Sequence, residues 1–253
     1  MKSLEEMNGF AIDLGGTKTA AARIKNCQII ERKILPTDGG AAPSKQLTAI
    51  ADLLASIGYR RGDRLGVAIT GRVDKAGVWY AVNQETLGQI NAVPIAKSID
   101  DTIGPAAIIN DAAAATLAEA HFGSGKGCQN FGYVTVSTGV GGGLFLGGRL
   151  HQSINGISGH IGFTTSSRGT QMCGSGRHGT VESVAGGNAI KRAAKELGYS
   201  TFDARDVFAQ AADNVSWAVA IVDESAHSIA ELCANLTTTL GLDAVAIGGS
   251  IGM

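Results

Sequence analysis

The sequence predicts an α/β fold with two similar lobes, and three observations lead to that expectation. Two segments, 10–24 and 131–147, each have the pattern of a strand, a glycine turn with hydroxyl groups, and a second strand. Strand-like runs alternate with helical periodicity along the rest of the chain, which is the order of elements in α/β proteins. A chain of 253 residues with 44% hydrophobic residues can bury a core in each of two lobes. We place these lobes at residues 1–112 and 113–253.

The first strand–turn–strand segment is the most informative stretch. Phe10, Ile12 and Leu14 alternate with small or polar residues, which is the period of a pleated strand. Gly15-Gly16 then allows a tight turn and leaves backbone N–H groups open to an anion, because no Cβ stands in the way. The second segment repeats this pattern, so two hairpins are available to hold a polyphosphate.

The remaining elements follow in chain order from periodicity and turn signals. Helices are predicted where apolar residues recur every three or four positions, at 44–57, 94–103, 111–122, 183–196, 204–211 and 213–239. Strands are predicted at 65–70, 73–82 as a short hairpin, 106–109, 131–147 as the second hairpin, and 244–247. The glycine-rich region from 147 to 187 has no period and is too long for an ordinary connection, so we expect it to carry function. A helix normally follows a last strand in such folds, so we expect that a C-terminal helical segment is missing.

The composition and charge of the chain indicate which kinds of binding partner to expect. The formal net charge is −1 and the 21 Lys and Arg residues are scattered, which argues against nucleic acid or an anionic membrane. No signal peptide is recognisable, and no stretch reaches the ~18 apolar residues of a membrane span. The four cysteines have no paired metal-ligand spacing, which favours a reducing cytoplasm. We expect a cytoplasmic protein that binds small molecules.

Three glycine-rich motifs fail the structural context that each requires. Residues 174–179 match G-x-G-x-x-G, but no strand precedes them, which excludes a dinucleotide-binding turn. Residues 248–252 match the G-x-S-x-G nucleophile motif, but the acid and His of a hydrolase do not follow. The spaced glycines of a Walker A loop are also absent.

Two acidic positions are candidates for chemistry. Asp13 ends the first strand beside the glycine turn, where a carboxylate can hold a hydrated Mg²⁺ against phosphates, although an Asp that only caps the turn would have the same sequence. Asn110-Asp111 lies between a strand and a helix, where an N-cap is the simpler interpretation. The carboxyl end of a strand is also where α/β enzymes place site residues.

In order and spacing, four motifs together resemble the ROK family of sugar kinases and repressors. These motifs are Asp13–Lys18, Asn110-Asp111, Ser137–Gly143 and Gly186-Gly187. The resemblance covers essentially the whole chain. It implies a two-lobed ribonuclease-H-like fold, the fold of the actin, hexokinase and Hsp70 ATPases, with ATP and sugar in the cleft between the lobes.

The resemblance also implies residue roles. Asp111 is expected to be the catalytic base that takes the proton from the sugar 6-hydroxyl, and Asp13 to bind Mg²⁺ through water. The expected sugar-binding residues are Asn83, Asn110, Asp111, His160 and Glu182. The expected ATP-binding residues are Asp13, Gly15, Gly16, Thr17, Lys18, Thr138, Gly139, Val140, Gly141, Gly142, Gly143 and Gly249.

The sequence departs from the family pattern in the region 156–182. Most members carry Glu where His160 stands, and the bacterial N-acetylmannosamine kinases share the His. Of the four ligands of the family's zinc element only Cys173 remains, because Phe163, Ser175 and Thr180 replace the others. One thiolate cannot hold tetrahedral zinc, so we expect ATP and Mg²⁺ as cofactors and no zinc.

The resemblance, with His160 at this position, implies an ATP-dependent kinase that phosphorylates N-acetylmannosamine at the 6-hydroxyl in sialic acid catabolism, giving N-acetylmannosamine 6-phosphate and ADP. A glucokinase or another hexose kinase of the family is an alternative, and so is an inactive sugar-binding relative. A repressor is disfavoured, because only about eight residues precede the first strand and a helix-turn-helix is longer. The expected partners are sugar and ATP, in a homodimer.

Overall fold

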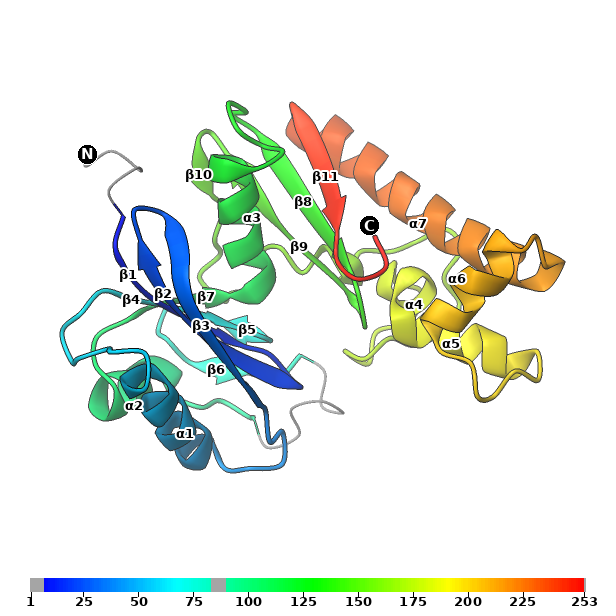
Figure 1. The fold of residues 1–253 in the computed structure, drawn as a ribbon. Coiled ribbons are helices and arrows are strands. Elements are labelled where there is room, and N and C mark those ends of the chain that lie inside the picture. Colours follow the sequence, from blue (N-terminus) through cyan, green and yellow to red (C-terminus); the bar gives the residue numbers. More distant parts are fainter. Residues whose placement is uncertain (1–6, 83–89, 253) are drawn as a thin grey trace. The chain divides into compact units, whose positions relative to one another are not determined.

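The computed structural model describes residues 7–82 and 90–252, which form two compact units (Figure 1). Unit 1 runs to Ala114 and also includes Ser153–Ile157. Unit 2 comprises Ala115–Gln152 and the chain from Ser158 onward. The division therefore falls inside helix α3 (Asp111–Phe122), two residues beyond the boundary predicted from the sequence, and one short segment returns to the first unit.

Unit 1 is built on a five-stranded sheet. Its order is β3-β2-β1-β4-β7, with β1 at Gly9–Leu14, β2 at Lys18–Lys25, β3 at Gln28–Pro36, β4 at Leu65–Ile69 and β7 at Ala107–Asn110. Strands β1, β4 and β7 are parallel, and β2 and β3 are antiparallel to their neighbours. The carboxyl ends of three neighbouring strands therefore meet at one edge of the sheet.

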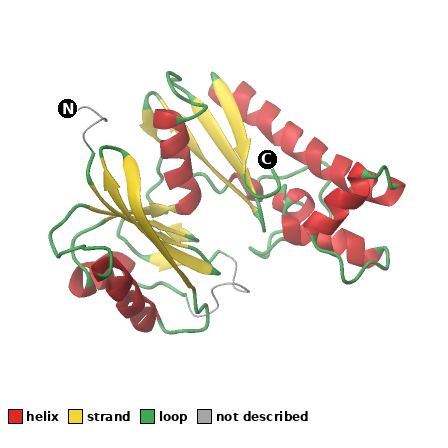
Figure 2. Cartoon of the chain, in the orientation of Figure 1, coloured by secondary structure: helices red, strands yellow, loops and turns green. Residues whose placement is uncertain are grey.

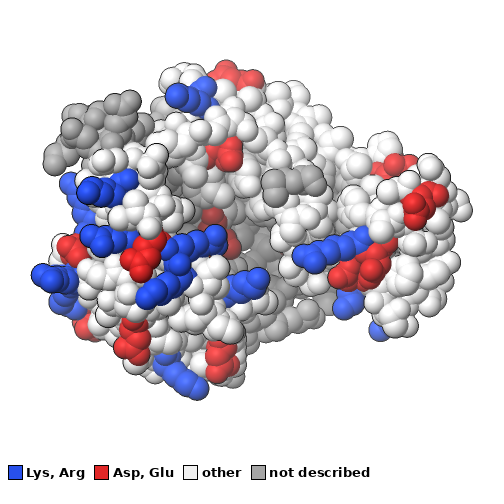
Figure 3. Space-filling model, in the orientation of Figure 1, with Lys and Arg blue, Asp and Glu red and all other residues white. Residues whose placement is uncertain are grey.

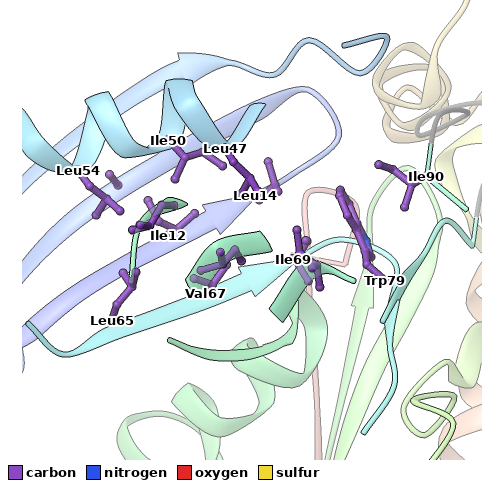
Figure 4. Close-up of a cluster of buried hydrophobic side chains, with 14 of the residues drawn as sticks. Ile12, Leu14, Leu47, Ile50, Leu54, Leu65, Val67, Ile69, Trp79 and Ile90 are labelled. Carbon is purple, nitrogen blue, oxygen red and sulfur yellow. The ribbon is translucent and has the colours of Figure 1, made fainter. Parts of the chain in front are cut away.

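The core of unit 1 lies on one face of this sheet (Figure 4). Ile12 and Leu14 alternate with Ala11 and Asp13, so that only the larger apolar side chains are buried. Helix α1 (Pro43–Ala55) covers them with Leu47, Ile50 and Leu54, which recur at helical spacing. Asp13 lies on the opposite face, among small residues such as Ala11 and Ala68.

Smaller elements complete unit 1. Strands β5 (Arg72–Val73) and β6 (Trp79–Tyr80) form a short hairpin, as the sequence predicted, and helix α2 (Ile95–Thr102) follows. The Trp79 side chain is only 1% exposed, and its indole Nε1 donates to the carbonyl of Thr70 at 2.8 Å. This bond fixes the hairpin against the end of β4.

Unit 2 combines a four-stranded sheet with helices (Figure 2). Its strands, in the order β10-β9-β8-β11, are Arg149–Leu150, Val140–Leu146, Phe131–Val136 and Ala244–Gly248. The helices after β10 are a short 3-10 turn at Ile161–Phe163, then α4 (Glu182–Ala185), α5 (Gly187–Glu196), α6 (Ala204–Ala212) and α7 (Ser216–Leu240). One core packs α7 against the sheet through Ile229 and Leu232, and a second core joins α5, α6 and α7 around Ile190 and Val207.

The structure corrects three secondary-structure predictions. Strand β3 was not predicted, because its isoleucines do not alternate and Ile29, Ile30 and Ile34 stay exposed at the sheet edge. The two-residue strand β10 was also missed. The single helix predicted over 183–196 is wrong, because Gly186 adopts extended backbone (φ −67°, ψ 151°) and separates α4 from α5.

Charged side chains of both signs are interspersed on the face in Figure 3, in line with the balanced composition. Within residues 7–82 and 90–252, no helix combines the length and the apolar character that crossing a bilayer requires.

Candidate active site

The candidate site in unit 1 lies at the carboxyl ends of the parallel strands. Leu14, Ile69 and Asn110 stand in one row of the sheet, since Leu14 pairs with Ile69 and Ile69 with Asn110. Asp13 lies one residue earlier in β1, and Asp111 one residue beyond the end of β7, both off the face that α1 covers. The sheet register thus places two carboxylates that are 98 positions apart in the chain at the same edge, where the charge of Asp13 contributes to raising the pKa of Asp111.

Asn110 and Asp111 form a fixed pair at the start of α3. The Asn110 Oδ1 accepts the backbone N–H of Ala113 at 3.1 Å, so Asn110 is the N-cap of the helix. Both hydrogens of its amide are also used, in 2.8 Å bonds to the carbonyl of Gly71 and to Asp111 Oδ1. A sugar hydroxyl can therefore reach Asn110 only through the remaining lone pair of its oxygen.

The Asp111 carboxylate is oriented by its neighbours. Its Oδ1 accepts the backbone N–H of Ala112 at 2.8 Å as well as the Asn110 amide. The Thr70 side chain also makes a hydrogen bond to the carboxyl group. Burial raises the pKa of Asp111 above its ordinary value of 3.8, these bonds oppose the shift, and the negative charge of Asp13 adds to it. The arrangement yields a carboxylate that is fixed in direction and more basic than a free Asp.

Asp13 differs from Asp111 in its exposure. Much of the Asp13 side chain is exposed. Partial burial of its carboxyl group nevertheless raises the pKa of Asp13, and the positive charge of the Arg32 guanidinium on β3 opposes this shift. Arg32 stands opposite Ala22, on the same face of the sheet as Asp13. An exposed carboxylate beside a glycine turn can bind a hydrated cation.

The turn after Asp13 is tight and ordered. The Gly15 N–H donates to the Lys18 carbonyl at 3.0 Å, and the Thr37 N–H donates to the Thr17 carbonyl at 2.9 Å. A Cβ added at Gly15 would lie only 3.0 Å from the Lys18 oxygen, so the close approach within the turn, rather than a left-handed φ, favours glycine here.

The second glycine hairpin lies in unit 2, between β8 and β9. Its tip is closed by a 2.9 Å bond from the Ser137 N–H to the Gly139 carbonyl. Gly187 and Asn188 donate their N–H groups to the carbonyls of Ser137 and Thr138, at 2.8 and 3.0 Å. The break at Gly186 thus lets the start of α5 bind the hairpin tip.

Glu182 lies against this hairpin. Its Oε2 accepts the Val140 N–H at 3.0 Å, and a Cβ on Gly139 would lie 2.3 Å from the same oxygen. Burial raises the pKa of Glu182, while the Val140 and Gly174 N–H groups and the Cys173 thiol lower it. Glycine at 139 therefore makes room for a carboxylate.

The glycines of β9 have a packing role. Gly142 leaves space for Ile161, whose Cδ1 would lie 2.3 Å from an added Cβ, and Gly143 leaves space for Thr116 of α3 at 2.2 Å. Gly142 and Gly143 are both paired with residues of β8. Gly249, in the turn after β11, has a φ of +96° and would place a Cβ 2.3 Å from the Val136 carbonyl.

His160, Phe163, Cys173 and Ser175 lie in the loop before α4. The His160 ring stacks on Phe163, with ring centroids 5.7 Å apart and planes at 29°. Cys173 is buried, with its Sγ 3.0 Å from the Ser175 hydroxyl. In the described part of the chain no group of three or more His, Cys, Asp or Glu side chains is placed to hold a metal ion.

The sequence-predicted residues thus fall into two groups. Unit 1 holds Asp13, Gly15–Lys18, Asn110 and Asp111, and unit 2 holds Thr138–Gly143, His160, Glu182 and Gly249. Asn83 lies outside the described residues. Sequence reasoning missed Thr70, Gly71 and Arg32. For Thr70 and Gly71 a signal existed, because they follow a parallel strand and share its carboxyl end.

Comparisons with known proteins show the family of the chain and its fold. A model of the ROK family matches residues 9–253. The chain belongs to the ROK family. It is 38% identical to an N-acetylmannosamine kinase of Haemophilus influenzae (strain PittEE) over 248 residues, which are 98% of this chain and 82% of that protein. It is also 38% identical to an N-acetylmannosamine kinase of Vibrio cholerae (O1, strain O395) over 253 residues, with 98% and 85% covered.

Among solved structures, the chain is similar to a ROK hexokinase of Thermus thermophilus. The TM-score is 0.84 at 30% sequence identity, over 97% of this chain and 82% of that one. The match confirms the fold class expected for this ROK protein, the α/β fold of the actin-like ATPases.

Proposed function

We propose that this ROK protein is an ATP-dependent kinase that phosphorylates N-acetylmannosamine at its 6-hydroxyl and releases ADP. The single observation that carries the choice of sugar is the 38% identity to N-acetylmannosamine kinases over 98% of the chain. The oriented carboxylate of Asp111 supports the reaction type.

In this proposal Asp111 is the general base. It takes the proton from the 6-hydroxyl as that oxygen forms a bond to the γ-phosphorus of ATP and the bond to the bridging β,γ-oxygen breaks. The N–H of Ala112 and the amide of Asn110 hold Oδ1 in place. The raised pKa of Asp111 makes the carboxylate a better acceptor for this proton.

Asp13 fits a role in holding Mg²⁺ through water. It is an exposed oxygen donor beside the Gly15–Lys18 turn, and a single carboxylate with several waters and substrate phosphates is the usual protein environment of Mg²⁺. The ion would neutralise charge on the transferring phosphoryl group.

The two glycine hairpins are the proposed phosphate-binding elements. Gly15–Lys18 supplies a tight turn with an exposed lysine, and Thr138–Gly139 forms the tip that α5 supports. The packing found for Gly142 and Gly143 leaves the tip, rather than the strand, as the proposed contact. We propose Gly249 as a neighbour of the adenosine.

His160 is the proposed specificity residue, and Glu182 the proposed second sugar contact from unit 2. A neutral imidazole offers one donor and one acceptor, whereas Glu offers acceptors only. The axial 2-acetamido group of N-acetylmannosamine carries a carbonyl acceptor, which a His donor can bind. Stacking on Phe163 restricts the ring to few orientations.

A second candidate is a kinase for glucose or another hexose. The Thermus thermophilus ROK hexokinase, with a TM-score of 0.84, favours it. An inactive sugar-binding relative remains the third candidate. We also propose that the protein is cytoplasmic and binds no nucleic acid. We propose in addition that it forms a homodimer, and light scattering on the purified protein tests this oligomeric state.

The proposed function is tested by measuring ADP release with four sugars: N-acetylmannosamine, N-acetylglucosamine, glucose and mannose. We expect the highest kcat/KM for N-acetylmannosamine. The product should be heavier by one phosphoryl group, and that group should be attached at the 6-hydroxyl. The Asp111→Asn variant, purified in the same way, shows whether the turnover belongs to this protein. A higher kcat/KM for glucose would favour the hexose kinase, and no turnover of any sugar would favour the inactive relative.

We further propose that the loop at 163–182 carries no zinc. The support is that Phe163, Ser175 and Thr180 replace ligands of the family's zinc element, while the Cys173 thiol lies against a serine hydroxyl. Elemental analysis of protein purified without chelator is the test. About one zinc per chain would contradict this proposal.

A further inference from the structure

His160 and Glu182 are joined by a short two-stranded ladder. The Val181 N–H donates to the Thr164 carbonyl at 3.0 Å, and the Ser166 N–H donates to the Gly179 carbonyl at 3.0 Å. Residues 164–166 continue from the turn that contains His160, and residues 179–181 lead directly into Glu182. A shift of the ladder therefore moves both side chains.

Helix α7 binds this ladder through one carboxylate. The Glu231 Oε2 accepts the backbone N–H of Ser167 at 3.0 Å and the hydroxyl of Ser166 at 3.3 Å. Its pKa is lowered, chiefly by the bond from the Ser167 N–H, as expected for a carboxylate that accepts several bonds. Charge-assisted bonds of this kind are stronger than neutral ones.

Buried hydroxyls extend the same contact. The Ser228 hydroxyl donates to the Ser166 hydroxyl at 2.9 Å, and these side chains are 0% and 3% exposed. A buried hydroxyl that loses its partner is costly. The Ser166 hydroxyl, held between Ser228 and Glu231, therefore has a defined position on α7.

The spacing of these residues on α7 shows that one helix face makes the contact. Glu224, Ser228 and Glu231 follow one another at intervals of four and three, which places them on one side of the helix. Glu224 pairs with Arg168 at 2.6 Å, one residue beyond Ser167. A helix of 25 residues packed in the core of unit 2 is a rigid support for the loop.

We propose that Glu231 is a positioning residue for sugar binding: through Ser166 and Ser167 it fixes the ladder that sets His160 and Glu182. The inference rests on the proposed function only in that His160 and Glu182 contact the sugar. The attachment of the loop to α7 is independent of that function.

The experiment compares Glu231→Ala and Glu231→Gln with Asp223→Asn. Asp223 is an exposed acid on the same helix, so its variant loses an equal charge without altering the loop contact. Glu231→Gln keeps the size and one acceptor, and it remains informative if Glu231→Ala does not fold. Far-UV circular dichroism confirms the fold of each variant.

The first measurement does not require activity. Trypsin cleaves after Arg168 and Arg177, which are both exposed in the loop. We expect Glu231→Ala to be cut at these bonds on the order of tenfold faster than the wild type, with Glu231→Gln between them and Asp223→Asn unchanged. Equal cleavage in all four proteins would overturn the inference.

The second measurement separates positioning from stability alone. We expect the KM for the sugar to rise roughly tenfold in Glu231→Ala, as for the loss of one polar contact worth ~1–3 kcal/mol. The KM for ATP should stay within about twofold of the wild type, because the ladder does not include the proposed phosphate-binding turns. Faster cleavage with an unchanged sugar KM would show a purely structural role and overturn the proposal. If the wild type phosphorylates no sugar, the proposed function fails, and the cleavage result alone then decides whether Glu231 holds the loop.

Discussion

Replacing Asp111 by Asn removes the proposed base and alters little else. The Asn carbonyl oxygen can take the place of Oδ1, which accepts the Ala112 N–H and the Asn110 amide, both at 2.8 Å. The variant therefore keeps the anchored half of the side chain and loses the basic oxygen. It also removes the group whose pKa the negative charge of Asp13 helps to raise.

A correctly placed general base contributes on the order of 10²–10⁴ in rate. We therefore expect kcat of Asp111→Asn to fall by about that factor, while the KM for the sugar stays within a few-fold. A coupled ADP assay with saturating ATP measures kcat, and calorimetric titration of the sugar measures binding. A kcat within about tenfold of the wild type would refute the assignment of Asp111 as the base.

Thermal stability provides an independent check of the same substitution. The pKa of Asp111 is raised in the folded protein, so the ionised carboxylate costs stability at neutral pH and costs nothing below its ordinary value of 3.8, where it is protonated in both states. The variant should thus be at least as stable as the wild type at pH 7. The difference should shrink as the pH approaches 3.8. A large loss of stability at pH 7 would show that the carboxylate has a structural role.

Three further predictions follow from single side chains. The kcat should fall as the pH drops through the raised pKa of Asp111, at a midpoint above 3.8, and a pH–rate profile that is flat down to about pH 4 would contradict this. His160→Glu should lower the kcat/KM ratio of N-acetylmannosamine to N-acetylglucosamine by about ten- to hundredfold, whereas an unchanged ratio places specificity elsewhere. Gly249→Ala should destabilise the protein in chemical denaturation by at least twice the ~1 kcal/mol that the left-handed φ alone costs. Gly176→Ala is its matched control, with φ +81° but no atom near the added Cβ; equal losses would refute the role of the Val136 carbonyl.

Much of unit 1 was predictable because its signals are local. The alternation around Ile12, the glycines after Leu14 and the Asn110-Asp111 junction each specify an element within a few residues. The structure confirms the strands and the helix start at these places. The chemical roles of these residues stay predictions.

The remaining features depend on contacts between distant parts of the chain. The break at Gly186 depends on the carbonyls of Ser137 and Thr138, about fifty positions earlier, which helical periodicity does not register. From the sequence, Gly142 was predicted to bind phosphate as part of a glycine-rich turn. In the structure, the space next to its Cα is filled by the Ile161 side chain. Arg32 influences Asp13 only because β3, an exposed edge strand, pairs beside β2.

The return of Ser153–Ile157 to unit 1 matters for anyone who divides this protein into fragments. The Ile154 carbonyl accepts the Lys75 N–H at 2.9 Å, and the Asn155 carbonyl accepts the Arg72 guanidinium. Gly156, with φ +71°, lies so close to the Val73 carbonyl that a Cβ would be only 2.1 Å from the oxygen. A recombinant fragment that ends at Ala114 would omit this peptide. A split-protein design should therefore avoid separating residues 153–157 from unit 1. Alternatively, these five residues can be joined to the fragment by a linker or added as a separate peptide.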